Sequence, residues 1–177
     1  GYMNFEPTCI KIIDNPIFQR LRDIKQLGLS HKIFPGACHT RFQHSLGVAF
    51  LSEKLLINIR QNQPELNITD KDILNVKIAG LVHDLGHACL SHFFDNLFLK
   101  DSKSIYKEHE NRSMLLLDYI VSEYNINELD NDDVNFIKKL LMPDKNCIGF
   151  IYQIVSNSKN GLDTDKFDYI CRDSKNL

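Results

Sequence analysis

The feature that most constrains this chain is a helical spacing of apolar residues that recurs along its whole length. Between Asn15-Pro16 and Gly28, apolar side chains return every three residues, which places them on one face of a helix. Asn followed by Pro is a favourable helix start, and Gly is a common stop. The alternation of Val, Ile and Thr that marks a half-buried strand is nearly absent. The sequence therefore predicts an all-α fold.

Capping residues and prolines predict where the further helices begin and end. Thr40 precedes a long helix that Pro64 ends, and Thr69 with Asp72 forms a capping pair ahead of another. The predicted helices span residues 41–61, 73 into the 80–87 segment, 91–99, 108–124, 130–142, 148–155 and 165–172. A chain of 177 residues with 43% hydrophobic side chains suits one core. We expect a single domain over residues 1–177, built from antiparallel or orthogonal helices.

Charge and cysteine usage exclude several classes of protein. The formal net charge is −2, so a polyanion-binding surface is not predicted and nucleic acid is not expected as the main partner. The first 60 residues carry more basic than acidic side chains, which suits an anionic ligand or merely reflects uneven solvated faces. Five widely spaced cysteines predict reduced thiols, several of them in the core. With no signal peptide and no apolar run long enough for a membrane span, we expect an intracellular protein, cytoplasmic or nuclear.

The strongest chemical signal is His83-Asp84 at the end of an apolar helical segment. Burying these two ionisable groups without a partner costs several kcal/mol, and a divalent ion removes that cost for both. His87 lies one helical turn beyond His83, so the two imidazoles are expected to share a face. A single histidine on an apolar helix is more often a hydrogen-bonded core residue, so the pair alone leaves both interpretations open.

Two ligands are too few for a metal site, so others must come from distant segments. The candidates are His44, in the segment 41–47, and an aspartate in the segment 161–173. Arg41 and His44 are three residues apart on a helix and share a face, as do Asp165 and Tyr169, which are four apart.

These residues belong to an ordered set of motifs that covers nearly the whole chain. The matching stretches are residues 18–28, 34–37, 41–48, 78–87, 91–95, 108–110 and 154–173. In this set the sequence resembles the HD-domain metal-dependent phosphohydrolases. Within that family it is similar to the deoxynucleoside triphosphate (dNTP) triphosphohydrolases that carry a sterile-alpha-motif domain beside the HD domain. The resemblance implies an all-α HD-domain helical assembly.

The resemblance also implies a role for each matching residue. The implied metal ligands are His44, His83, Asp84 and Asp165. The implied catalytic side chains near the scissile bond are His87, His92, Asp95 and His109. The implied substrate contacts are Arg41 and Lys166 to the phosphates, Tyr169 and Asp173 to the sugar, and Gln26 and Leu27 in the sugar and base pocket. The implied contacts to a guanine nucleotide activator are Asp14, Gln19 and Arg22. For Asp14 and Arg22 the alternative is a purely structural role, Asp14 as a helix-start residue and Arg22 as a solvated side chain.

The implied reaction is metal-dependent hydrolysis of a dNTP to a deoxynucleoside and triphosphate. One divalent transition metal ion is expected, Fe, Mn, Zn, Co or Ni, with Mg accompanying the nucleotide phosphates. A histidine that titrates near neutral pH suits protonation of the leaving sugar oxygen, and His92 is our candidate. The alternatives are an HD phosphohydrolase for another nucleotide, or a nucleotide-sensing module without turnover.

Two regions of these relatives have no counterpart in this sequence. One is the stretch before the first helix that binds the phosphates of the activator, and the other is a helical region after Leu177. We therefore expect the sequence to be a piece of a longer chain, with homo-oligomer formation a property of the full-length protein.

Overall fold

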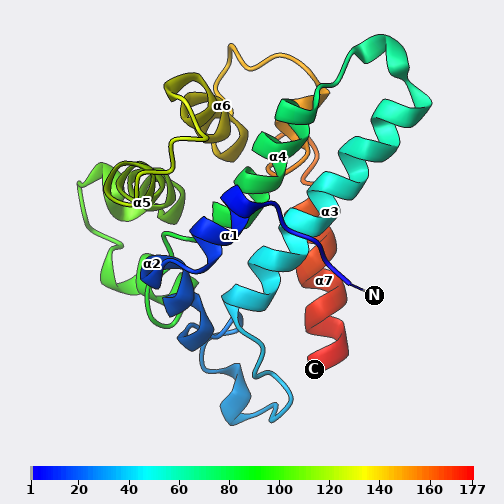
Figure 1. The fold of residues 1–177 in the computed structure, drawn as a ribbon. Helices are drawn as coiled ribbons and strands as arrows, with labels where there is room; N and C mark the ends of the chain where they lie inside the picture. The colour runs from blue at the N-terminus through cyan, green and yellow to red at the C-terminus, as the bar shows by residue number, and fades with distance from the viewer. Residues whose placement is uncertain (1) are drawn as a thin grey trace.

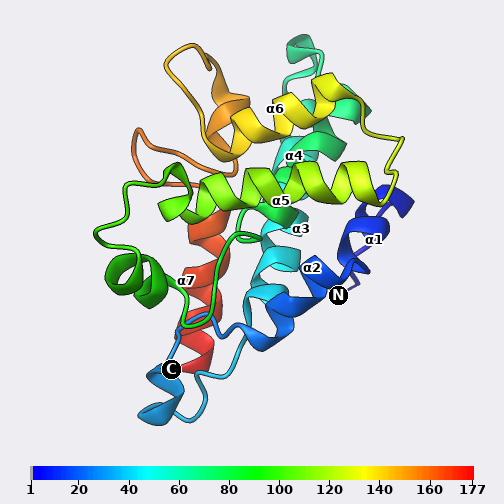
Figure 2. The ribbon, with the colours of Figure 1, turned by 90° about the vertical axis from the view of Figure 1, so that its left-hand side faces the viewer.

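The computed structural model describes residues 2–177 as a bundle of α-helices (Figures 1 and 2). The α-helices are α1 Pro7–Ile13, α2 Pro16–Gln19, α3 Arg41–Asn62, α4 Asp70–Val82, α5 His109–Glu123, α6 Asn131–Leu141 and α7 Thr164–Asn176. Short 3-10 or π-helical turns lie between them, at η1 Arg20–Asp23, η2 Ser30–Lys32, η3 Pro64–Leu66, η4 Phe94–Phe98, η5 Ile105–Lys107 and η6 Phe150–Gln153. Among the described residues the only strand-like pairing is an isolated bridge between Lys25 and Thr40. The predicted all-α fold is confirmed.

The long predicted helices form close to their predicted bounds because their caps form. The Thr69 hydroxyl accepts a hydrogen bond from Asp72 N at 3.1 Å, while Thr69 N donates to the Asp72 carboxylate at 2.9 Å. Asp130 caps α6 in the same reciprocal way with Asp133. Such pairs satisfy backbone N–H groups that have no partner within the helix.

The segment after Asn15 differs from the prediction. The helix α2 ends at Gln19 and continues only as the 3-10 turn η1, instead of running to Gly28. Two backbone bonds account for the early end. Arg41 N donates to Ile24 O at 2.9 Å and Gln26 N donates to His39 O at 3.0 Å, which a helix through these residues would prevent.

Two further predicted helices are shorter or less regular than predicted. In the segment 91–99, His92 and Phe93 are α-helical and continue into the π-helical turn η4, while residues 148–155 form only the 3-10 turn η6. The apolar side chains of η4 do not cover a core, since Leu97 and Phe98 are exposed. A short helix gains most of its stability from packing an apolar face, which η4 lacks.

The helices α3 and α4 pack against each other at the centre of the molecule, with α7 on α3 and α6 on α4 (Figures 1 and 2). The approach of α3 and α4 is close because position 80 has no side chain. A Cβ atom on Gly80 would lie 3.1 Å from the backbone N and Cα of Ala49 and 3.0 Å from the Ser52 hydroxyl. This contact brings the first turn of α3 beside the C-terminal end of α4.

The remaining sequence expectations concern cysteines and membranes. Within residues 2–177 all five cysteines are free and Cys9 is the only buried one, so the expectation of several core cysteines is wrong. Cys38, Cys89 and Cys171 lie in loops or on the outer face of α7 and are exposed. Within residues 2–177, no helix is both long enough and apolar enough to cross a membrane.

Candidate metal centre and adjoining histidine cluster

Four side chains from three distant segments meet at the C-terminal end of α4. His83 directly follows α4, His44 lies in the first turn of α3, and Asp165 lies in the first turn of α7. His44 Nε2 lies 3.1 Å from His83 Nε2, 2.9 Å from Asp165 Oδ1 and 3.6 Å from Asp84 Oδ2. His83 Nε2 lies 3.5 Å from an oxygen of each carboxylate. Metal–ligand bonds of about 2.0–2.2 Å produce such ligand-to-ligand separations. Ligand atoms of His44, His83 and Asp84 lie within 4.8 Å of one another, close enough to share one cation, and Asp165 adjoins this group through its contacts with the two imidazoles.

The charges around this centre favour a bound cation. Burial alone would raise the pKa of Asp84, but the charge of Arg41 and the nearby imidazoles hold it well below its usual range. Burial alone would lower the pKa of His44, but hydrogen bonds to Asp165 and Asp168 and the charge of Asp84 raise it to about 9. The carboxylates that raise the pKa of this imidazole would also attract a metal ion, which would take the place of its proton.

The two imidazoles are oriented through their other ring nitrogens. His44 Nδ1 lies 2.7 Å from Asp168 Oδ2, and His83 Nδ1 lies 2.8 Å from Gly80 O. An acceptor at Nδ1 keeps a proton there and leaves the Nε2 lone pair free for a metal. Arg172 holds the Asp168 carboxylate in turn through two hydrogen bonds of 2.8 and 2.7 Å. The sequence analysis missed Asp168, although its place three residues after Asp165 on one helix face was a usable signal.

Arg41 connects this centre to the segment that carries His92. Its side chain is 3% exposed, and Nη1 donates to Asp84 Oδ2 at 2.5 Å. Arg41 Nε donates to Ser91 Oγ at 2.9 Å. Leu90 and Ser91 adopt positive φ angles of 65° and 56°, a conformation that costs a non-glycine residue about 1–2 kcal/mol. The contact with Arg41 helps to hold this unfavourable turn, which sets the direction of the next residue, His92.

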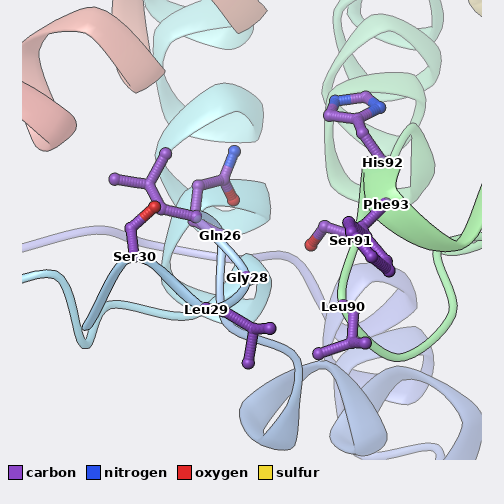
Figure 3. Close-up of a pocket in the computed structure, with 9 residues that line it drawn as sticks. Gln26, Gly28, Leu29, Ser30, Leu90, Ser91, His92 and Phe93 are labelled. Carbon is purple, nitrogen blue, oxygen red and sulfur yellow. The ribbon is translucent and has the colours of Figure 1, made fainter. Parts of the chain in front are cut away.

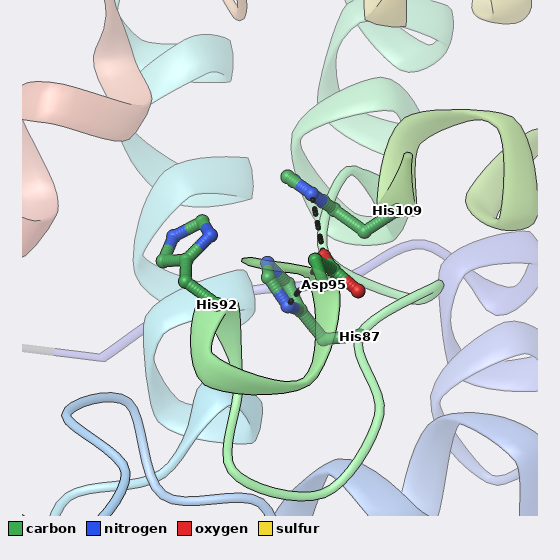
Figure 4. Close-up of side chains that lie close together, drawn as sticks. All are labelled: His87, His92, Asp95 and His109. Atoms are coloured by element: carbon green, nitrogen blue, oxygen red, sulfur yellow. Dashed lines mark ion pairs between the residues drawn. The ribbon is translucent and has the colours of Figure 1, made fainter. Parts of the chain in front are cut away.

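A second cluster lies beside the first and contains the other three motif histidines (Figure 4). The rings of His87 and His109 are stacked with centroids 3.9 Å apart, and the His92 ring centroid lies 4.8 Å from that of His87. Asp95 Oδ2 lies 3.5 Å from His109 Nδ1 and 4.0 Å from His87 Nδ1. Four ligand atoms of these residues lie within 4.8 Å of one another, close enough to share a water molecule or an ion.

His87 belongs to this second cluster and does not share a helix face with His83. That expectation is wrong because α4 ends at Val82 and the next residues form turns, in which His87 N donates to Asp84 O at 3.0 Å. Burial lowers the pKa of the His87 imidazole to about 3, so the ring is neutral. Neither ring nitrogen has a hydrogen-bond partner among residues 2–177, although Nε2 lies 3.3 Å from Asp84 Oδ1. The neutral ring is thus free to accept or donate a hydrogen bond to a bound molecule.

Two neighbouring cavities adjoin these clusters. One, of about 410 Å³, is lined by Gln26, Leu27, Arg41, Asp84, His92, His109, Glu110, Asp165, Tyr169 and Asp173. The other, of about 420 Å³, lies between the segments 26–30 and 90–93 and shares Gln26, Leu27 and His92 with the first (Figure 3). Such volumes suit a small-molecule ligand.

Some residues implied by the resemblance lie outside these cavities. Lys166 does not line either cavity, and its ammonium group lies near Gly161. Gln19 and Arg22 lie away from them and bond to each other at 2.6 Å, and the Arg22 guanidinium lies 3.6 Å from the ring centroid of Phe42. Asp14 is exposed at the C-terminal end of α1.

The first cluster fits a divalent transition metal by the chemistry of its donors. Two imidazole nitrogens and two carboxylate oxygens form a set that Fe, Mn, Co, Ni and Zn accept, whereas Ca prefers oxygen ligands alone. The side chains of His44 and Asp84 are 1% and 4% exposed, whereas that of Asp165 is 37% exposed, so the cluster is open to solvent on the Asp165 side.

Comparison with known proteins extends these observations. The family model of the HD domain matches residues 41–140. The whole chain is 43% identical to a mouse deoxynucleoside triphosphate triphosphohydrolase, SAMHD1, and 43% identical to the putative HD domain-containing protein L394 of Acanthamoeba polyphaga mimivirus. Over 98% of its length it is 42% identical to a SAMHD1 homologue of Dictyostelium discoideum. The chain spans 30%, 41% and 34% of the lengths of these three relatives.

Proposed function

The chain belongs to the HD domain family, and on that premise we propose that it is a metal-dependent phosphohydrolase acting on dNTPs. The proposed reaction converts a dNTP and water into a deoxynucleoside and inorganic triphosphate. The observation that carries the proposal is the meeting of two histidines and two aspartates beside a cavity that also contains Arg41 and His92. The names of the mouse and Dictyostelium relatives support dNTPs as the substrate class.

We propose that His44, His83, Asp84 and Asp165 hold the metal ion. When bound, a divalent ion supplies positive charge for the phosphate oxygens and makes an attacking water more acidic. The metal ion in this proposal is one of Fe, Mn, Zn, Co or Ni, with Mg on the nucleotide phosphates. Asp168 and the backbone carbonyl of Gly80 orient the two imidazoles.

Arg41 is proposed to bind a phosphate group of the substrate. Its guanidinium lines the cavity and lies against Asp84, so a phosphate there would lie between the guanidinium and the metal centre. A planar guanidinium can donate two parallel hydrogen bonds to phosphate oxygens, and such donors stabilise charge that develops in the transition state. Lys166, implied by the resemblance to contact the phosphates, would have to turn its side chain away from Gly161 to reach them.

His92 is the proposed acid that protonates the leaving sugar oxygen. It lines both cavities, and His87, His109 and Asp95 lie beside it. Burial and the charges of Arg41 and His109 lower the pKa of His92 in the absence of substrate. A bound triphosphate carries the opposite charge and raises that pKa, so substrate binding itself would favour the protonated acid.

The sugar and base are proposed to lie against one wall of the cavity. Tyr169, Asp173, Gln26 and Leu27 line that wall, and Asp173 is held by His39 Nε2 at 2.6 Å. An Asp173 carboxylate fixed in this way is placed to accept a hydrogen bond from the sugar 3′-hydroxyl. A close fit of Tyr169 against the sugar 2′ position predicts faster turnover of dGTP than of GTP.

A guanine nucleotide activator is also proposed, on the resemblance of Asp14, Gln19 and Arg22 alone. Its guanine base would have to displace the 2.6 Å hydrogen bond between Gln19 and Arg22. Activation of dATP turnover by added GTP would support this part of the proposal, and self-association of the full-length protein would be measured with and without GTP.

The direct test incubates the chain and Mn²⁺ with a panel of nucleotides and separates the products by anion exchange. Triphosphate and deoxynucleoside are expected. Orthophosphate or pyrophosphate would instead indicate a hydrolase for another nucleotide. Binding of metal and nucleotide with no product would indicate a sensor.

The role of His92 is tested with His92→Ala at saturating substrate. Removal of a general acid is expected to lower kcat by about 10²–10⁴-fold with unchanged metal content. The control is His31→Ala, because His31 lies outside both clusters on the turn η2. A His92→Ala chain with the kcat of the unmodified chain would exclude the proposed acid.

A further inference from the structure

One arginine that neither cluster contains connects three segments around the second cluster. Arg112 lies in the first turn of α5, and its side chain is 17% exposed. Its Nε donates to Gly86 O at 2.8 Å, and Nη2 donates to Asp95 Oδ1 at 2.5 Å. Its Nη1 donates to the carbonyl oxygens of Tyr106 and Lys107, both at 2.8 Å. One planar guanidinium thus forms four hydrogen bonds to three separate parts of the chain.

Each of these segments places a residue of the second cluster. Gly86 directly precedes His87 in the turn after α4. Asp95 is itself a member of the cluster, and Tyr106 and Lys107 form the turn η5 that leads to His109. The relative positions of His87, Asp95 and His109 therefore depend on a single side chain.

The neighbouring contacts leave the turn at Gly86 little room to move. Gly86 N donates to Ser113 Oγ at 2.8 Å, and Ser113 Oγ donates to His83 O at 2.7 Å. A Cβ atom at position 86 would lie 2.6 Å from Ser113 N and 2.8 Å from Arg112 Cβ. Helix α5 thus packs directly against the backbone of this turn, which allows the short Arg112–Gly86 bond.

Asp95 depends on Arg112 for its ion pair and its position. Its side chain is 8% exposed, and its ion pair with Arg112 leaves Oδ2 without a hydrogen-bond partner within residues 2–177. That free oxygen is the atom nearest to His109 Nδ1 and His87 Nδ1 (Figure 4). Without the guanidinium, a nearly buried carboxylate would lose its ion-pair partner, which is costly, so the side chain would leave its position.

We propose that Arg112 is a positioning residue for the hydrolysis, which fixes Asp95 and the backbone on either side of it so that the histidines keep their arrangement. The inference rests on the proposed function. It concerns a residue that contacts neither the metal ligands' side chains nor the cavities described above. Loss of Arg112 should therefore lower kcat and leave KM and metal binding almost unchanged.

Arginine and lysine differ in this position. A lysine ammonium can pair with Asp95, but it cannot also reach Gly86 O and the two carbonyls of η5 in one plane. A role limited to the charge of Asp95 predicts that Arg112→Lys restores kcat. The bridging role predicts that Arg112→Lys remains impaired, and that added guanidinium ion partly rescues Arg112→Ala.

The experiment compares Arg112→Ala, Arg112→Lys and Arg60→Ala with the unmodified chain. Four quantities are measured for each: kcat and KM for a dNTP, the affinity for Mn²⁺, and the rate of hydrogen exchange in residues 86–107. Arg60→Ala is a matched control, since Arg60 forms a 2.6 Å ion pair with Asp70 on the surface. Displacement of catalytic groups by about 1 Å can cost about 100-fold, so a 10- to 100-fold lower kcat is expected for both Arg112 variants. Faster exchange confined to residues 86–107 should accompany it.

The outcomes separate this inference from the proposed function. An unmodified chain without phosphohydrolase activity would overturn the proposed function, while hydrogen exchange would still report whether Arg112 orders residues 86–107. An active chain whose Arg112→Ala form keeps kcat within twofold would overturn the positioning role alone. An Arg112→Lys form with full kcat would limit Arg112 to a charge partner of Asp95 and would contradict the bridging role.

Discussion

Asp168→Asn should weaken metal binding although Asp168 is not itself a proposed ligand. The Asp168 carboxylate accepts three hydrogen bonds, from His44 Nδ1 at 2.7 Å and from Arg172 at 2.8 and 2.7 Å. An asparagine has the same shape but only one acceptor oxygen. Its amide nitrogen must then face one of these donors, and either His44 or Arg172 has to shift.

The size of the effect follows from the hydrogen bond by which Asp168 orients His44, a proposed metal ligand. Changes to groups that orient a metal-binding histidine typically cost 10- to 100-fold in metal affinity. That range corresponds to about 1.4–2.7 kcal/mol of binding free energy. The asparagine also removes a negative charge close to the cation, which acts in the same direction.

Isothermal titration of the metal-depleted chain with Mn²⁺ measures this affinity directly. Asp118→Asn is the control, because Asp118 forms an exposed 2.6 Å pair with Lys138 on α5 and α6. Arg172→Gln separates the two contacts of Asp168, since it keeps the bond to His44, and it should cost far less affinity. An Asp168→Asn chain that is folded by circular dichroism and binds Mn²⁺ within twofold of the unmodified chain would refute the reasoning.

Two further predictions concern groups outside the metal centre. Burial and the charge of Glu6 raise the pKa of the Cys9 thiol to about 12. Cys9 should therefore resist a thiol reagent at pH 8 until the chain is unfolded, while exposed Cys38 reacts at once. Labelling of Cys9 in the folded chain, located by peptide mass spectrometry, would contradict this prediction. For Glu6, burial raises the pKa, but the hydrogen bond from Lys77 Nζ at 2.9 Å and the charge of Lys77 outweigh burial and lower the pKa below 4.5. The stabilising contribution of Glu6 is therefore present above that value and is lost as the pH falls through the lower folded-state pKa. Urea unfolding from pH 6 to pH 3 should show a smaller loss of stability in Glu6→Gln than in the unmodified chain, and equal losses would be the contrary result.

The sequence predicted the long helices and drew attention to His83-Asp84 because both follow from local pattern. Residues that begin or end α4 and α6 form their own caps, and His83-Asp84 follows directly from an apolar helix. The family motifs then supplied the distant partners of that pair, His44 and Asp165. His44, His83 and Asp84 have ligand atoms within 4.8 Å of one another, and Asp165 lies 2.9 Å from His44 Nε2, while their role as metal ligands stays a prediction.

What the sequence did not predict depends on contacts between distant segments. The turn after Gln19 replaces a helix because residues 24–26 bond to residues 39–41, and no periodicity records such a pairing. Arg112 looks like any charged residue at a helix start, and its four bonds become visible only when α5 lies across three loops. Asp168 could be placed on the correct helix face, but its partner His44 lies on another helix.

The missing side chain at Gly80 ties the metal centre to the interior of the fold. His44 and Ala49 belong to α3, and Gly80 and His83 to the end of α4, so the gap between the helix backbones also sets the gap between the two imidazoles. A single added methyl group at position 80 would press on Ala49 at 3.1 Å and wedge the helices apart by tenths of an ångström. Metal affinity would then report on how well the core is packed. Core substitutions far from the proposed ligands should lower that affinity before they unfold the chain.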